Sequence, residues 1–163
     1  MSDSVSRPMR RFDRAVTGLQ DMLAILEKSK VLHLGMTGPE GPYVVPLNFA
    51  YRESNGILTL FFHCAQSGKK VDMLAVDGRV CFEVDCSHQL VEGTTACSYG
   101  YSYESIIGFG KARLLTDQKE KIDGISALMM RFSQAEAFEF DPSVVERTAV
   151  YVVDVAHITG KRR

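Results

Sequence analysis

The feature that most constrains the fold is a run of strand-forming residues followed closely by a helix start, between residues 56 and 76. Residues 57–62, Ile-Leu-Thr-Leu-Phe-Phe, combine β-branched, leucine and aromatic side chains, and a turn sequence at 53–56 precedes them. We expect the strand to end at His63. A short polar loop then leads into a helix over residues 69–76.

The helix start carries two lysines, in the sequence Ser67-Gly68-Lys69-Lys70. Lysines are unfavourable in a first turn, because the helix N-terminus already carries partial positive charge, and each costs about 0.3 kcal/mol or more. A bound anion removes that cost. A strand, a small-residue loop and a lysine-rich helix start together are typical of a phosphate site. The alternative is that both lysines point into solvent, and this stretch alone favours neither.

The rest of the chain consists mostly of further strands. Hydrophobic alternation and turn signals predict five more, at residues 31–37, 43–51, 79–86, 103–115 and 148–158. Helices are expected before the first of these strands, at 69–76, and from Thr116 onward, with a short turn at 143–147. Six short strands and three helices indicate a mainly β fold with peripheral helices. We predict a six-stranded antiparallel barrel, closed or split.

Two segments depart from regular strand sequence. Pro46 lacks an amide donor, so its strand should lie at a sheet edge or be bulged there. Residues 87–102 show no period and are long for a loop, which favours a functional segment or disorder. Tyrosines at 99, 101 and 103 argue against disorder; they could cover a planar ring or pack on a second subunit.

Length and charge limit the function classes. A chain of 163 residues is one domain's worth, and we expect a single domain with a flexible tail at residues 1–8. The net charge of −1 gives no general attraction to nucleic acid or to a membrane surface. The chain contains no run of eighteen apolar residues and no apolar signal core at its start, so a cytoplasmic protein is expected.

The four cysteines show no C-x-x-C pair, and reduced thiols are expected because the sequence shows no sign of secretion. A zinc site could draw on Cys81, Cys86, His88 and Cys97, but their spacing fits no common zinc pattern. In an unbroken strand Cys81 also falls on the opposite face from Cys86. We therefore expect no metal site.

Several sequence blocks occur together in a recognisable order. They are Met9-Arg-Arg11, Val45-Pro-Leu-Asn-Phe49, Leu60-Phe-Phe-His-Cys-Ala-Gln-Ser-Gly-Lys-Lys70, Val80-Cys-Phe-Glu83, Tyr103-Glu-Ser-Ile-Ile-Gly-Phe-Gly-Lys111 and Ile158-Thr-Gly-Lys161. Over residues 9–161 the chain resembles the FMN-binding split-barrel proteins related to pyridoxamine 5'-phosphate oxidase, in the nitroimidazole-resistance-protein branch. The combination of H-x-A-x-x-G-K-K with Y-E-S-x-x-G-x-G carries the resemblance.

The resemblance implies a homodimer with two FMN sites at the subunit interface. It implies that the flavin lies along a bulged strand at Val45, Pro46, Leu47 and Asn48, and that the FMN phosphate meets Ser67, Gly68, Lys69 and Lys70. It further implies that the partner chain supplies Tyr103, Glu104 and Ser105. With the resemblance, a phosphate site is favoured over solvated lysines.

His63 is the residue that the resemblance places at the flavin pocket. An imidazole has an ordinary pKa of about 6.5, so it could donate a proton to a reduced substrate or pair with a phosphate. The alternative is a strand-end histidine bonded to the backbone. The neighbouring Cys64 lies beside a cationic block, which should favour its thiolate, although nothing indicates a catalytic thiol.

Two functions follow from the resemblance. The first is an FMN-dependent oxidoreductase that passes electrons to a small planar acceptor such as a nitroimidazole or another nitroaromatic. No G-x-G-x-x-G fingerprint is present, so an NAD(P)H donor would bind only transiently. The alternative is a non-catalytic flavin-, deazaflavin- or haem-binding protein on the same fold. A haem protein would need an axial ligand, for which His63 or His88 is the candidate.

Overall fold

The computed structural model describes residues 8–135 and 137–163, so residues 1–7 of the expected tail lie outside the described part. The strands are β1 (Ala15–Val16), β2 (Val31–Gly38), β3 (Gly41–Asn48), β4 (Ala50–Ser54), β5 (Ile57–Ala65), β6 (Arg79–Val91), β7 (Gly100–Leu114) and β8 (Thr148–Arg162). The α-helices are α1 (Leu19–Lys28), α2 (Lys69–Val76), α3 (Gln118–Phe132) and α4 (Pro142–Glu146), with short 3₁₀ turns at Phe12–Arg14 and Ala96–Ser98.

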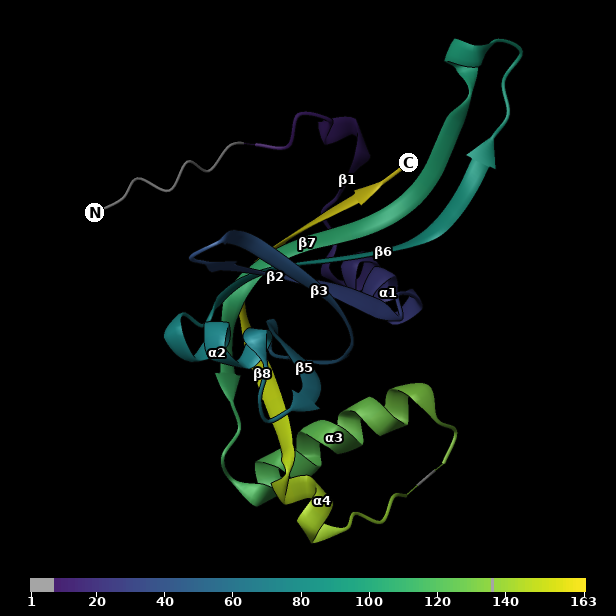
Figure 1. Ribbon diagram of the computed structural model, residues 1–163. Helices are drawn as coiled ribbons and strands as arrows, with labels where there is room; N and C mark the ends of the chain where they lie inside the picture. The colour runs from purple at the N-terminus through teal and green to yellow at the C-terminus, as the bar shows by residue number, and fades with distance from the viewer. Residues whose placement is uncertain (1–7, 136) are drawn as a thin grey trace.

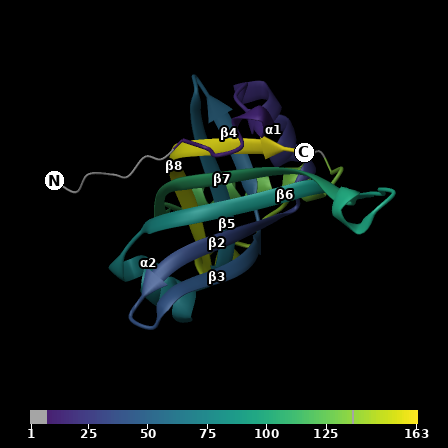
Figure 2. The same cartoon turned by 90° about the horizontal axis from the view of Figure 1, so that it is seen from above.

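The strands form one antiparallel sheet in the order β3-β2-β6-β7-β8-β5-β4, with β1 paired to β8 (Figures 1 and 2). The two end strands do not pair, so the sheet curls around its core without closing. This confirms the mainly β, split-barrel prediction. The count of six strands was too low, because β1 was not expected and residues 43–51 form parts of two strands.

The division of residues 43–51 occurs at Phe49. β3 pairs with β2 at one edge of the sheet, whereas β4 pairs with β5 at the other edge. The chain therefore passes from one edge to the other between Asn48 and Ala50, and the Phe49 side chain is fully buried at this crossing. Sequence alternation runs on through the crossing, so periodicity alone did not reveal it.

Pro46 lies in an edge strand, which is one of the two alternatives predicted for it. β3 pairs with β2 without a register shift from Gly41 to Asn48, and Pro46 lies opposite His33. The bulge that the resemblance implied in this strand is therefore not present. A missing amide donor is tolerated at an edge, since that strand has no neighbour on its other side.

The core has two parts on opposite faces of β5. Leu58, Leu60 and Phe62 point into the main core inside the curled sheet, whereas Phe61 packs with α3 residues on the other face. β5 continues to Ala65, so the expected strand end at His63 was wrong. His63 and Cys64 consequently belong to the strand and project from opposite faces of it.

Residues 87–102 mostly extend a β-hairpin. β6 continues to Val91 and β7 begins at Gly100, and the two strands project from the body as a curved arm (Figure 1). Pairing resumes at Gln89–Ser102 after a register shift beyond Cys86. The long loop was thus an incorrect expectation, and the bulge explains it, because one inserted position breaks the alternation that marks a strand.

The helices close the sheet's open sides. α2 occupies the predicted residues 69–76, while the turn expected at 143–147 is the short helix α4. α1 packs on β6 and β7, and α3 covers β4, β5 and β8. Within residues 8–135 and 137–163, no helix has both the length and the apolar character needed to cross a membrane.

Candidate anion and cofactor site

The start of α2 presents free donors and positive charge. Its N-cap is Gly68, with φ +131° and no side-chain cap. A Cβ on Gly68 would contact nothing within 4 Å, so the backbone here faces open space. The first amides of a helix have no partner inside the helix. Ser67 and Lys69 are exposed beside them. We call residues 67–70 the lysine corner. It offers both hydrogen-bond donors and positive charge to an anion.

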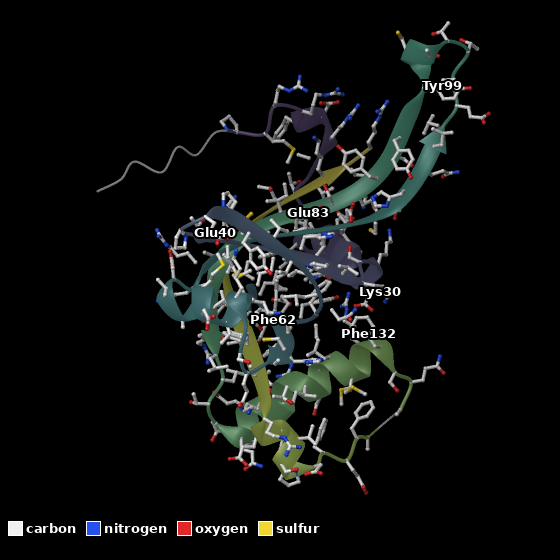
Figure 3. The ribbon with its side chains drawn as sticks, viewed as in Figure 1. Lys30, Glu40, Phe62, Glu83, Tyr99 and Phe132 are labelled. Carbon is white, nitrogen blue, oxygen red and sulfur yellow. The ribbon has the colours of Figure 1, made fainter. Side chains whose placement is uncertain are left out.

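Lys69 connects this corner to the β2–β3 turn. Its ammonium group forms an ion pair with Glu40 and lies 4.9 Å from the centre of the Tyr43 ring. The hydrogen bond to Glu40 raises the pKa of Lys69, and the same bond lowers the pKa of Glu40. A cavity of about 340 Å³ lies beside them, lined by Gly38, Pro39, Glu40, Gly41, Lys69, Asp72 and Met73. In Figure 3 Glu40 lies on the α2 side of the sheet.

Lys70 points toward the opposite side of the same helix start. Its ammonium group lies 5.8 Å from the centre of the Phe62 ring, and Phe62 stacks on Tyr151 with ring centres 5.1 Å apart. Burial raises the pKa of the Cys64 thiol, and the nearby Lys70 offsets this only in part. The expected thiolate at Cys64 was therefore wrong, because partial burial outweighs the neighbouring charge.

The inner face of β3 continues from the lysine corner. Tyr43, Val45 and Leu47 are half-buried against the main core, whereas Pro46 and Asn48 point outward. Asn48 donates a side-chain hydrogen bond to the Lys30 carbonyl at 3.2 Å. The structure thus brings the β3 segment close to Lys69 through Tyr43. The half-buried apolar face of β3 therefore lies beside the positively charged start of α2.

His63 lies away from the lysines. It is exposed on the face of β5 opposite Phe62, and it lines a cavity of about 260 Å³ together with Ile125, Phe140 and Val144, among others. α3, α4 and the segment before α4 supply most of this wall. The lining is largely apolar, with Glu139 and Asp141 as its acidic members. The imidazole therefore has access to a chamber separate from the lysine corner of the same chain.

Tyr103, Glu104 and Ser105 lie on β7 near the base of the arm. Glu104 is 7% exposed and its carboxylate accepts hydrogen bonds from Lys28 at 2.7 Å, Ser87 at 2.8 Å and Arg162 at 2.6 Å. These bonds, led by that from Lys28, lower the pKa of Glu104 to about 2. Within the described residues, no hydrogen bond or ion pair joins this cluster to Lys69 or Lys70 of the same chain. Its assignment to the cofactor site of a partner chain stays a prediction.

Sequence reasoning missed Glu40 and Tyr43. Both lie in or beside residues 38–42, between the strands predicted at 31–37 and 43–51, and neither residue was assigned a binding role from the sequence. Their contact with Lys69 spans almost thirty residues of sequence, and no local pattern marks it. The cysteines agree better with expectation: Cys86 packs against the main core, and Cys81 lies on the other face of β6.

Comparison with known proteins agrees with this geometry. The family model described as pyridoxamine 5'-phosphate oxidase matches residues 19–162. A solved structure from Bacteroides thetaiotaomicron, described as a candidate 5-nitroimidazole antibiotic resistance protein, is 30% identical with a TM-score of 0.80. The alignment covers 91% of this chain and 86% of that one. No curated protein sequence matches the chain.

Two more distant structures share the fold. A flavocytochrome from Azotobacter vinelandii is 22% identical with a TM-score of 0.82, covering 96% of this chain and 72% of its own. An FAD- and haem-binding protein from Mycobacterium smegmatis is 16% identical with a TM-score of 0.78, covering 91% of this chain and 73% of its own. The family match spans nearly the whole described chain, and the split barrel agrees with it. The chain therefore belongs to the pyridoxamine 5'-phosphate oxidase family.

Proposed function

We propose that this chain binds FMN and is an oxidoreductase that reduces a small planar acceptor, such as a nitroimidazole or another nitroaromatic. The observation that carries the proposal is the uncapped start of α2, where Lys69 lies beside the half-buried inner face of β3 and Lys70 lies over Phe62 of β5. Relatives described as flavin-binding, and one described as a candidate nitroimidazole-resistance protein, support it. The bound flavin would supply the electron chemistry.

The chain's own residues would bind and orient that cofactor. Lys69, Lys70 and the first amides of α2 would hold a terminal phosphate, since charge and free donors coincide there. Gly68 leaves room for the phosphate to approach the backbone. Val45 and Leu47 would contact the ring system. A compact phosphate monoester matches this corner, which is our reason for proposing FMN.

We propose His63 as the proton donor in turnover. Its imidazole is exposed and faces the cavity between α3 and α4. For this role, the acceptor or the flavin ring must reach that cavity. We therefore expect His63→Ala to keep FMN affinity within about twofold and to lower turnover by about a hundredfold, the lower end for a general acid. Normal turnover would remove His63 from the mechanism.

We also propose a homodimer in which the arm contacts the partner. Leu90, Val91, Tyr99 and Tyr101 are each about half exposed on the arm, which projects away from the chain's own core (Figures 1 and 3). Exposed apolar groups on a projecting hairpin are typical of an interface.

The four cysteines are free thiols, which suits a reducing compartment, and we propose a cytoplasmic location.

The first experiment compares FMN with riboflavin, which lacks the phosphate. The unmodified protein should bind FMN at least about tenfold more tightly, and the change Lys69→Ala with Lys70→Ala should remove that preference. The control pair Lys111→Ala with Lys119→Ala makes the same charge change elsewhere, and it should keep the preference. Equal affinity for both flavins in the unmodified protein would contradict the phosphate site.

Turnover separates the enzyme from a non-catalytic binder. The FMN-loaded protein is mixed with NADH or NADPH and a nitroimidazole without oxygen, and loss of the nitro absorbance is followed. Reduction over many turnovers supports the oxidoreductase. Retained flavin that passes no electrons to the acceptor would leave a binding protein, and a Soret band in place of flavin bands would indicate haem.

A further inference from the structure

A cluster of metal-ligating side chains lies outside the candidate flavin site. His33 Nδ1 lies 3.3 Å from Glu83 Oε2, and the ligand atoms of His33, Glu83 and Asp85 all lie within 4.8 Å of one another. Within residues 8–135 and 137–163, they form the one group of three or more such residues with this spacing. None of them lines the cavity beside Lys69 or the one beside His63.

The sheet places these groups on a rigid surface. β2 and β6 are adjacent central strands, and His33 lies directly opposite Glu83 in their pairing. Their core-facing neighbours Leu34 and Phe82 are fully buried, so alternation directs His33, Glu83 and Asp85 outward. Each of the three side chains keeps between 35% and 44% of its surface exposed, which leaves a path for an ion. Figure 3 labels Glu83 on this part of the sheet.

The bulge at the base of the arm adds a second histidine. In a regular strand, residues 85 and 88 would face opposite sides, because they are three positions apart. The register shift after Cys86, with Ser87 at φ +59°, turns His88 toward Asp85. His88 Nε2 lies 2.9 Å from Asp85 Oδ2, and its ring stacks on Tyr101. Bulges commonly redirect a side chain in this way.

The geometry points to a divalent transition-metal site in which His33, Glu83 and Asp85 are the ligands and His88 orients Asp85. An imidazole together with carboxylates suits zinc, cobalt or nickel better than calcium or magnesium, which prefer oxygen ligands. A neighbouring polar group that holds a ligand in place is a regular part of such sites. Three protein ligands leave coordination positions for water.

The surroundings support a site for a cation. Glu83 and Asp85 are two residues apart on β6, so both carboxylates lie on the same outward face with their oxygens close to each other and to His33 Nδ1. A bound divalent ion would offset the repulsion between two such neighbouring negative charges. Ile107 lies directly opposite Glu83 on β7 and Pro46 directly opposite His33 on β3, so apolar residues flank the cluster on both sides.

The test is a cobalt titration of tag-free protein that has been stripped with a chelator. Cobalt bound to nitrogen and oxygen ligands absorbs visible light, and zinc should displace it. We expect one ion per chain, and a loss of about tenfold or more in affinity in His33→Ala and in Glu83→Gln. His157→Ala is the matched control, because it removes an exposed histidine from β8, which is separated from β6 by β7. It should bind cobalt like the unmodified protein.

Circular dichroism of each variant shows whether it is folded, and Glu83→Gln keeps the side-chain shape should His33→Ala fail to fold. Equal cobalt affinity in Glu83→Gln and the unmodified protein would overturn the site. So would cobalt binding that His157→Ala weakens as much as His33→Ala does. The measurement needs no flavin, so it stands apart from the proposed function.

Discussion

In two parts of the molecule, a cationic side chain lies over aromatic rings at the end of a helix. The two parts differ in how many hydrogen-bond partners the protein itself supplies to the cation. Arg131 of α3 lies at the C-terminal end of α1, with its guanidinium 4.6 Å from the Phe49 ring centre and 5.1 Å from that of Tyr51. Lys69 and Lys70 lie at the N-terminal end of α2, over the rings of Tyr43 and Phe62. A helix dipole favours the first arrangement and opposes the second.

The partners differ as well. The Arg131 side chain is only 5% exposed and donates to the carbonyl oxygens of Leu26, Glu27 and Ser29, the last at 2.7 Å. It thereby satisfies carbonyls that the end of α1 leaves free. Lys69 has one exposed carboxylate partner, Glu40, and the amides at the start of α2 have no capping side chain. A buried arginine whose terminal nitrogens bond helix-end carbonyls fixes the fold, even though its Nε has no hydrogen-bond partner among the described residues. An exposed lysine with a single carboxylate partner remains available to a ligand.

The largest expected effect is on the stability of the fold, through Arg131. Arg131→Met should lower the free energy of unfolding by about 3–5 kcal/mol, because several helix-end carbonyls lose their buried charged donor. Urea denaturation followed by circular dichroism measures the change. Arg113→Met is the control; that arginine is half exposed and its ion pairs are on the surface, so the loss should stay below about 1 kcal/mol. Similar losses in both variants would remove the distinction between the two cation sites.

Substitutions in the lysine corner should change the affinity for the ligand rather than the stability of the fold. Lys69→Ala with Lys70→Ala should raise the FMN dissociation constant by tenfold or more, which corresponds to about 1.4 kcal/mol. Without flavin, the free energy of unfolding of the same variant should differ by less than about 0.5 kcal/mol from that of the unmodified protein, because two lysines beside a helix N-terminus contribute little stability. Isothermal titration and urea denaturation measure the two quantities. A large loss of stability in the flavin-free variant would make the lysines structural, like Arg131.

The cluster around Glu104 gives a smaller effect that depends on pH. Its pKa of about 2 in the folded chain lies below the ordinary value of 4.5, so folding favours the ionised carboxylate. The stability this contributes is complete above about pH 4.5 and is lost as the pH falls toward about 2. Glu104→Gln should therefore lose about 2 kcal/mol at pH 7 and show a weaker decline in acid. Parallel acid curves for the variant and the unmodified protein would contradict this.

Local sequence predicted the elements whose signals are local. The helix at 69–76 was predicted at its observed bounds, and the missing amide of Pro46 predicted an edge strand or a bulge, of which the structure has the edge strand. The arm was missed because the bulge after Cys86 breaks the alternation that identifies a strand. The extension of β5 to Ala65 was missed because His63 and Cys64 are not strand-forming signals, whereas pairing with β8 holds them in the sheet.

The sequence by itself determined a mainly β domain, a cationic helix start after a strand, and a resemblance that the family match bears out. These follow from side-chain periodicity, turn residues and helix-end charge, all of which operate within a few residues. Only the tertiary structure decided that Glu40 and Tyr43 join Lys69, that His63 faces a different cavity, and that His33 meets Glu83. Those contacts depend on strand order, register and a bulge, which are fixed by packing between segments that lie far apart in the chain.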